Sequence, residues 1–152
     1  MEGKDSGPPS STIYPPDTEV KVEPKPMVIN VTQSTEFHGD LRDTYRVRSK
    51  PKGWVLLINN EEFQCDKYPT RTGAEVDEKN LHSLFSQLGL SVLVRRNLKY
   101  AEMRRELSNF ADMEDHKFSD MAMVCICSHG VEKDKIISSD CKEMDIREDI
   151  LR

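Results

Sequence analysis

The sequence predicts an α/β fold with a mostly parallel central sheet. Three observations support this prediction: short apolar runs of strand length, segments of helical periodicity between them, and a regular alternation of the two. Alternating strands and helices form right-handed βαβ units, which build parallel sheets. The patterned region begins at Gly53, so about a hundred residues are available for one domain with a modest core.

The first predicted strand covers residues 53–59, a continuous apolar run that ends at Asn59 and Asn60. Such a run is typical of a strand buried on both faces. The next element is a predicted helix with an apolar stripe, an acidic residue (Asp77) near its positive end and Gly89 as its terminator; the stripe is Leu81, Leu84, Phe85 and Leu88. Residues 91–94 are the second predicted strand.

A second helix is predicted from the same helical spacing in Met103, Leu107, Phe110 and Ala111. Residues 120–128 form the third predicted strand, and their apolar run indicates a central position in a complete sheet. Residues 135–138 are expected to form a short hairpin arm, and residues 144–152 to begin another helix.

Residues 1–50 are predicted to be a disordered leader. They hold six of the eight prolines, and they have too few apolar clusters to offset the entropy lost on ordering. Within them, only the apolar patch 27–31 is a candidate strand, at the edge of the sheet.

The composition argues against several kinds of partner. A net charge of -5 and a pI near 5.4 are unfavourable for binding nucleic acid. No apolar run reaches the roughly eighteen residues that a membrane-spanning helix needs. The first residues lack the apolar segment of a secretory signal. We therefore expect a soluble protein of the cytoplasm.

The four cysteines lack the spacing of a zinc site, and we predict no metal or cofactor. Cys125 and Cys127 lie in the third apolar run and are expected in the core as free thiols. A reducing compartment is the default for such a protein. Cys65 is interpreted as an incidental loop thiol. Cys141 is a weak candidate nucleophile, because nothing near it in sequence would activate it.

Parallel sheets bind ligands beyond the carboxyl ends of their strands. Two segments are expected there, the loop with Arg71 and the tripeptide Ser128-His129-Gly130. His129 can act as a general base near neutral pH, and the N–H of Gly130 can donate to an oxyanion. The guanidinium of Arg71 can bind a carboxylate through two hydrogen bonds. The same positions also suit a histidine that only caps a strand and a solvated surface arginine.

Taken in order, the motifs resemble the caspase family. Three strings carry the resemblance: LINNEEF at 57–63, RTGAEVD at 71–77 and Ser128-His129-Gly130. Shorter matches fall between them, at 97–98, 107–111 and 116–120. The resemblance covers residues 53–152 and points to inflammatory caspases and to cell-death caspases of the initiator or nematode type.

The resemblance implies a caspase-like three-layer α/β fold, incomplete here, with residues 53–152 as a partial large-subunit (p20-like) domain. It implies a cysteine endopeptidase made as a zymogen that cleaves proteins after aspartate in apoptosis or inflammation. His129 is similar to the catalytic histidine, Gly130 to the oxyanion-hole glycine, and Arg71 to an arginine that binds the substrate aspartate. The backbone carbonyl of Pro69 is similar to the group that orients the histidine. The implied partners are a caspase small subunit or another caspase chain.

In caspases the cysteine motif Gln-Ala-Cys follows the histidine by about 50 residues. Counted from His129, that position lies beyond Arg152, so no nucleophile is assigned and the chain alone is expected to be inactive. Three interpretations stay open: a piece of an active protease, a short non-catalytic relative that binds full-length caspases, and an unrelated α/β binding module. A reading frame that continues into a Gln-Ala-Cys string would favour the first.

Overall fold

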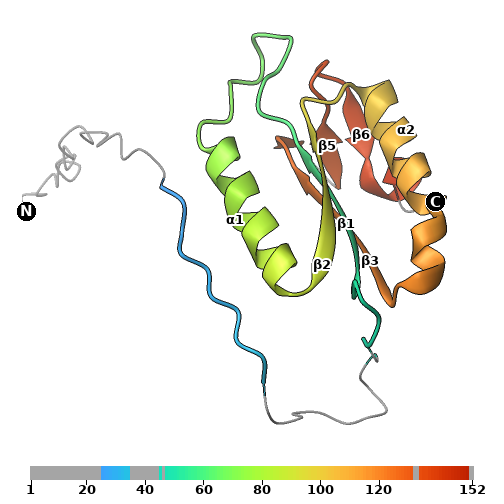
Figure 1. Cartoon of the computed structure of the whole chain (residues 1–152). Helices are drawn as coiled ribbons and strands as arrows, with labels where there is room; N and C mark the ends of the chain where they lie inside the picture. The colour runs from blue at the N-terminus through green and yellow to red at the C-terminus, as the bar shows by residue number, and fades with distance from the viewer. Residues whose placement is uncertain (1–24, 35–44, 46, 132–133, 151–152) are drawn as a thin grey trace, which may run out of the picture.

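The structure is a computed structural model that describes residues 25–34, 45, 47–131 and 134–150. Its centre is a parallel sheet with a helix on each face, as Figure 1 shows. Most of the predicted leader (residues 1–24, 35–44 and 46) lies outside the described residues. The three-layer α/β architecture predicted for the rest of the chain is confirmed.

The main sheet has the strand order β2-β1-β3, with all three strands parallel. The strands are β1 (Gly53–Asn59), β2 (Leu90–Arg96) and β3 (Met121–Cys127). In β1, the side chains of residues 55–58 are at most 1% exposed. The continuous apolar run of β1 therefore fills both faces of the sheet centre, as its sequence predicted.

Successive side chains of β1 point to opposite faces, because side chains alternate along a strand. Leu56 and Ile58 pack with Met103 and Phe110 of α2 (Tyr100–Ala111). Val55 packs on the other face with Phe85 of α1 (Ala74–Gln87). Each predicted helix therefore covers one face of the sheet, and β1 joins the two cores.

Two glycines fix where β1 begins and where α1 ends. A Cβ atom on Gly53 would lie 2.1 Å from the carbonyl oxygen of Met121, so the close approach of β1 and β3 requires glycine. Gly89 follows α1 with φ +86°, a left-handed conformation that glycine adopts at low cost. Its N–H donates to the carbonyl oxygen of Ser86 at 3.0 Å.

A second, antiparallel sheet of order β4-β5-β6 follows β3. Its strands are β4 (Gly130–Val131), β5 (Lys135–Ile137) and β6 (Glu143–Asp145). The predicted hairpin arm is therefore present, but the predicted helix from residue 144 is wrong at its start. Met144 is fully buried in a strand against the α2 core, and a single wide turn, η2 (Ile146–Ile150), follows.

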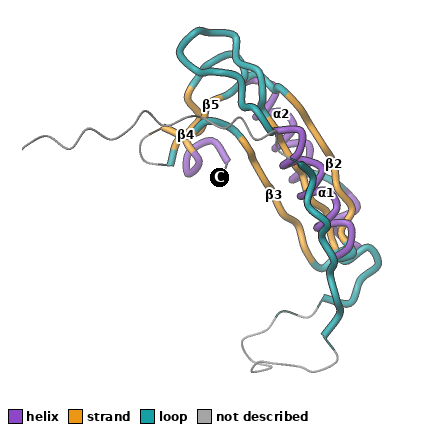
Figure 2. Tube along the Cα trace, turned by 90° about the vertical axis from the view of Figure 1, so that its left-hand side faces the viewer, coloured by secondary structure: helices purple, strands orange, loops and turns teal. Residues whose placement is uncertain are grey.

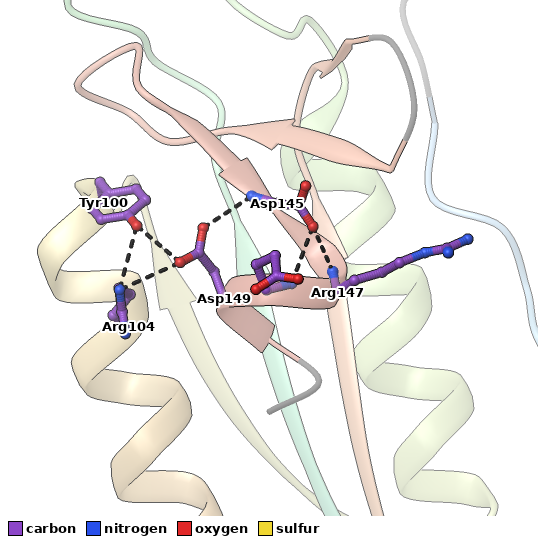
Figure 3. Close-up of polar contacts among 6 residues, drawn as sticks. Tyr100, Arg104, Asp145, Arg147 and Asp149 are labelled. Atoms are coloured by element: carbon purple, nitrogen blue, oxygen red, sulfur yellow. Dashed lines mark hydrogen bonds and ion pairs between the residues drawn. The ribbon is translucent and has the colours of Figure 1, made fainter.

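Polar contacts attach this second sheet to α2. The carboxylate of Asp149 accepts hydrogen bonds from the hydroxyl of Tyr100 at 3.0 Å and from the guanidinium of Arg104 at 3.3 Å (Figure 3). Its second oxygen accepts the backbone N–H of Asp145 at 3.0 Å. A short 3-10 turn, η1 (Glu114–Phe118), leads from α2 into β3.

The apolar patch 27–31 is not a strand, which corrects the edge-strand prediction. It runs extended beside α1, where the N–H of Met27 donates to the side chain of Asn80 at 2.9 Å. The N–H of Val31 donates to Gln87, whose amide in turn donates to the carbonyl oxygen of Ile29 at 2.7 Å. Helix side chains therefore satisfy backbone groups that a sheet edge would otherwise pair.

β3 pairs with β1 on one side only, so it forms an edge of the sheet within the described residues. The sequence predicted a central position for this strand in a complete sheet. At the open edge seen here, Val124 is 40% exposed. Cys125 and Cys127 are half-buried, not fully in the core as predicted, and both lie on this edge strand. No helix in the described part of the chain is both long and apolar enough to cross a membrane.

Candidate functional site

Polar residues follow each strand of the main sheet at its carboxyl end. Asn60 after β1 is fully buried, and its side-chain oxygen accepts the N–H of Leu98 at 2.9 Å. Its amide group donates to the carbonyl oxygen of Ile137 at 3.4 Å. Asn60 therefore connects the ends of β1 and β2 to the hairpin that follows β3.

Asn97, after β2, fixes the start of the long loop between β1 and α1. Its backbone is left-handed, with φ 51°, a conformation that asparagine tolerates better than most residues. Its side-chain oxygen accepts the N–H groups of Glu61 at 2.8 Å and Glu62 at 3.0 Å. The loop and the hairpin lie at the same end of the molecule (Figure 2).

His129 is held from two sides by this loop. Its Nε2 atom lies 2.8 Å from the carbonyl oxygen of Pro69. Its ring lies 4.7 Å from the ring centroid of Phe63 and stacks on Tyr68 at 5.6 Å. A carbonyl oxygen can only accept, so Nε2 carries the proton in this contact. The neutral ring then presents Nδ1 as its basic atom.

Gly130 directly follows His129 and is exposed in β4. The carbonyl oxygen of His129 accepts the N–H of Ile137 at 2.9 Å, which fixes the backbone at this point. Apart from the adjacent residues of the chain, the nearest atom to a Cβ added to Gly130 would be the carbonyl oxygen of Lys135, at 4.0 Å. The surface around Gly130 is therefore open.

Arg71 differs from a solvated surface arginine, because its side chain is only 19% exposed. Its Nη1 atom donates to the side-chain oxygen of Asn59 at 3.1 Å and to the carbonyl oxygen of Asn60 at 3.0 Å. Its Nη2 atom lies 3.7 Å from the carboxylate of Asp77. The guanidinium is thus positioned at the carboxyl end of β1, and it has five N–H donors in total.

Cys127 lies opposite Asn59 in the sheet, near Arg71. A hydrogen bond from the Cys125 thiol and the positive charge of Arg71 lower the pKa of Cys127 to about 7, against the opposing effect of burial. The pKa of Cys125 is raised by the same hydrogen bond and by burial. A thiol of lowered pKa beside the candidate site was not expected from the sequence.

Cys65 and Cys141 form a disulfide, with their Cα atoms 6.3 Å apart. This corrects the interpretation of Cys65 as an incidental thiol and of Cys141 as a candidate nucleophile. The sequence does not indicate this bond, because 76 positions separate the two residues. Phe63 and Tyr68 were not predicted as contacts of His129. The signal available in the sequence was the presence of two aromatic residues in the loop before Arg71.

The structure therefore brings His129 and Pro69 into contact and places Arg71 and Gly130 at the same edge of the sheet. Within the described ranges, no group of three or more His, Cys, Asp or Glu side chains has the arrangement of a metal site. These features define an α/β domain with a polar site at the carboxyl edge of a parallel sheet, where such sheets bind ligands.

Comparison with known proteins identifies the family. The model of the caspase domain matches residues 52–152. Caspase a of Danio rerio is 43% identical over 91 residues, which are 59% of this chain and 24% of the relative. Cell death protein 3 of Caenorhabditis remanei is 37% identical over 109 residues, 72% of this chain and 20% of the relative. The chain belongs to the caspase family.

Solved structures agree with this assignment. A structure of pro-sf-caspase-1 superposes with a TM-score of 0.62 and 29% identity, over 68% of this chain and 44% of that one. Caspase-1 from Spodoptera frugiperda gives a TM-score of 0.62 and 31% identity, over 66% of this chain and 40% of that one. The chain spans about a fifth to a quarter of the length of the two curated relatives named above.

Proposed function

We propose that this chain supplies the histidine-bearing half of a caspase-type cysteine endopeptidase, which cleaves after aspartate in apoptotic or inflammatory signalling in the cytoplasm. The contact of His129 Nε2 with the Pro69 carbonyl oxygen, at 2.8 Å, carries the proposal. It leaves Nδ1 to accept a proton and fixes the ring in one orientation. A histidine that only capped a strand end would not need its ring held between Phe63 and Tyr68.

In the proposed reaction, a cysteine thiol transfers its proton to Nδ1 of His129 and the thiolate attacks the peptide carbonyl carbon. The oxyanion that forms accepts the N–H of Gly130. The C–N bond then breaks, and the amine leaves with the proton from His129. Water hydrolyses the remaining thioester, with His129 again accepting a proton, and the thiol is regenerated.

Arg71 is the proposed binding group for the carboxylate of the substrate aspartate. Two of its donor contacts, to Asn59 and Asn60, hold the guanidinium at the strand end. Its weak pairing with Asp77, at 3.7 Å, can be exchanged for a bidentate contact with a substrate carboxylate.

The 152 residues contain no Gln-Ala-Cys string, so the proposed nucleophile belongs to another segment. That segment is proposed to lie along the open edge of β3. Two apolar cavities flank this edge, one on each face of the sheet. The first, of about 290 Å³, includes Val124 and Ile126, and the second, of about 250 Å³, includes Met121 and Met123. A neighbouring strand and the layers beside it would cover both cavities. Because that strand is also proposed to carry the nucleophile, this chain alone is proposed to be inactive.

The same open edge favours a second candidate function, a non-catalytic relative that binds full-length caspases. An unpaired strand edge with apolar flanks is a template for pairing with another chain. The two functions differ in the segment that covers β3: the protease requires one that carries the cysteine motif. An open reading frame that continues from Arg152 into such a motif would favour the protease, and a stop codon there the regulator.

Substrate selectivity tests the protease directly. The chain would be combined with a downstream segment that carries the Gln-Ala-Cys motif and the small-subunit strands. Two reporter peptides, with aspartate or asparagine before the cleaved bond, would then be compared. We expect Arg71→Ala to lower kcat/KM for the aspartate peptide by about 100-fold or more, since a charge-assisted contact is lost. The control Arg105→Ala changes an exposed arginine of α2 and leaves the rate unchanged. Equal loss in both variants would contradict the role of Arg71.

A further inference from the structure

We propose that Cys65 and Cys141 form a redox-modification site, at which a dithiol reductant opens the disulfide and releases the loop that positions His129. The bond joins the loop between β1 and α1 to the turn between β5 and β6. It is independent of the two free cysteines in β3. Its effect on catalysis rests on the proposed function, whereas the opening of the loop does not.

The Cys141 side of the bond is firmly anchored without the disulfide. Ser138 and Ser139 are buried, and the N–H of Ser139 donates to the carbonyl oxygen of Leu98 at 2.9 Å. The carboxylate of Asp140 accepts the N–H of Tyr100 at 2.8 Å. These contacts attach the turn to the start of α2, and the Asp149 network attaches the strand that follows to the same helix (Figure 3).

The Cys65 side lies in a loop that is anchored mainly at its base. The N–H of Arg71 donates to the carbonyl oxygen of Glu61 at 3.0 Å and closes the loop. Asn97 holds the first residues of the loop at the same end. Farther out, the N–H of Gln64 donates to the carbonyl oxygen of Ser139 at 2.8 Å, directly beside the disulfide. The disulfide thus reinforces the one backbone hydrogen bond that joins the outer loop to the hairpin turn within the described residues.

The outer loop is also the part that holds His129. Tyr68 and Pro69 follow Cys65 by three and four residues, and they supply a stacked ring and the carbonyl oxygen at 2.8 Å. Phe63 precedes Cys65 by two residues and packs on the same ring at 4.7 Å. Opening the disulfide at Cys65 therefore affects each of these contacts, because only a few residues of chain separate them from Cys65.

A reductant can reach the disulfide, because both cysteines are partly exposed. Each is also followed by an exposed residue, Asp66 after Cys65 and Lys142 after Cys141. In the reaction, a thiolate of the dithiol attacks one sulfur of the disulfide and a mixed disulfide forms. The second thiol of the reductant displaces the protein sulfur. Two electrons and two protons pass to Cys65 and Cys141, and the reductant becomes a cyclic disulfide. A disulfide oxidant reverses the step.

When the bond opens, the turn keeps its anchors and the loop becomes the mobile partner. A disulfide restricts the open states of the chain it closes, and its loss raises the frequency of local opening. We expect residues 62–70 to open more often, with β1 and α2 unchanged. The Pro69 carbonyl then leaves Nε2 of His129 for part of the time, and the ring loses its fixed orientation.

Amide hydrogen exchange of the purified chain, before and after treatment with dithiothreitol, tests the proposal. Alkylation and mass measurement should first show two accessible thiols among the four cysteines without reductant and four with it. We expect reduction to speed exchange in residues 62–70 by about tenfold or more, with little change in β1. The His129 ring resonances should shift in the same step.

The double variant Cys65→Ser, Cys141→Ser should show the fast exchange with or without reductant. The matched variant Cys125→Ser, Cys127→Ser should keep the full response of the wild-type chain. Four free thiols in the untreated protein, or equal exchange of the loop in the two redox states, would overturn the proposal. Neither readout uses a peptidase assay, so failure of the proposed protease activity would leave this result unaffected.

Discussion

The carboxylate of Asp140 accepts the backbone N–H of Tyr100 at 2.8 Å, and this bond joins the hairpin turn to the first turn of α2. The same carboxylate accepts the hydroxyl of Ser138 at 2.6 Å and lies 3.1 Å from the ammonium of Lys142. Burial opposes the ionisation of Asp140, but these hydrogen bonds outweigh it and lower the pKa to about 2. Asp140 is therefore an electrostatic anchor of the end of the molecule that carries the candidate site.

This anchor makes stability depend on acid pH. Because the pKa of Asp140 is lower in the folded state, its contribution is complete above the unfolded pKa of about 4 and is lost as pH falls toward about 2. We expect Asp140→Asn to lower the free energy of unfolding by about 1–2 kcal/mol at pH 7 and by much less at pH 2.5. Urea unfolding at both pH values measures this, with Asp112→Asn at an exposed position as control. A cost that does not shrink in acid would contradict the assignment.

Asn60 is a buried polar connection between three segments, and its removal should be costly. Asn60→Ala leaves the N–H of Leu98 without the acceptor it uses at 2.9 Å. We expect a loss of about 2–3 kcal/mol in the free energy of unfolding, since a buried donor would be left unsatisfied. Asn109→Ala, at an exposed position of α2, should change it by about 0.5 kcal/mol or less. Chemical denaturation of both variants would show equal stability if the buried contact were unimportant.

Substitution by alanine should destabilise the chain at Gly53 but not at Gly130. Gly53→Ala would place Cβ 2.1 Å from the carbonyl oxygen of Met121, so β1 and β3 must separate. We expect a lower melting temperature and a loss of about 2–3 kcal/mol or more. Gly130→Ala has open space and should fold like the wild-type chain. Similar melting temperatures for the two variants would show that the strand contact is looser than described.

The open edge of β3 should cause the isolated chain to associate. Backbone groups along that edge have no strand beside them in the described part of the chain, and Val124 is 40% exposed. We expect sedimentation to show concentration-dependent association that Val124→Lys reduces, because a charge on an edge strand opposes pairing. Val28→Lys, at an 89% exposed position away from the sheet, should have no effect. A monodisperse wild-type monomer with a cooperative melt would contradict this expectation.

The sequence could predict the elements that depend on local pattern. The continuous apolar run of β1 and the helical spacing of the α1 stripe are both visible in the sequence, and Gly89 ends its helix by a backbone preference. β6 is a three-residue strand that exists through pairing with β5, so no local pattern indicates it. The Cys65–Cys141 bond likewise depends on the tertiary arrangement of a loop and a turn.

The candidate site likewise has features that the sequence predicts and features that depend on the tertiary arrangement. His129 and Arg71 were predicted from their positions after strands, which the topology of a parallel sheet makes meaningful. The lowered pKa of Cys127 arises from a thiol two residues away on the same strand face and from Arg71 on another segment. Such an effect is visible only when the three groups are placed in space.

The central claim is that His129 is the catalytic base, and peptidase kinetics of the combined enzyme test it most directly. The chain would be paired with a segment carrying the Gln-Ala-Cys motif and assayed with an aspartate reporter peptide. We expect His129→Ala to lower kcat by about 1,000-fold or more, and the exposed His82→Ala to leave it unchanged. The chain without the segment should show no turnover. Full activity of the His129→Ala enzyme, or activity of the chain alone, would contradict the account.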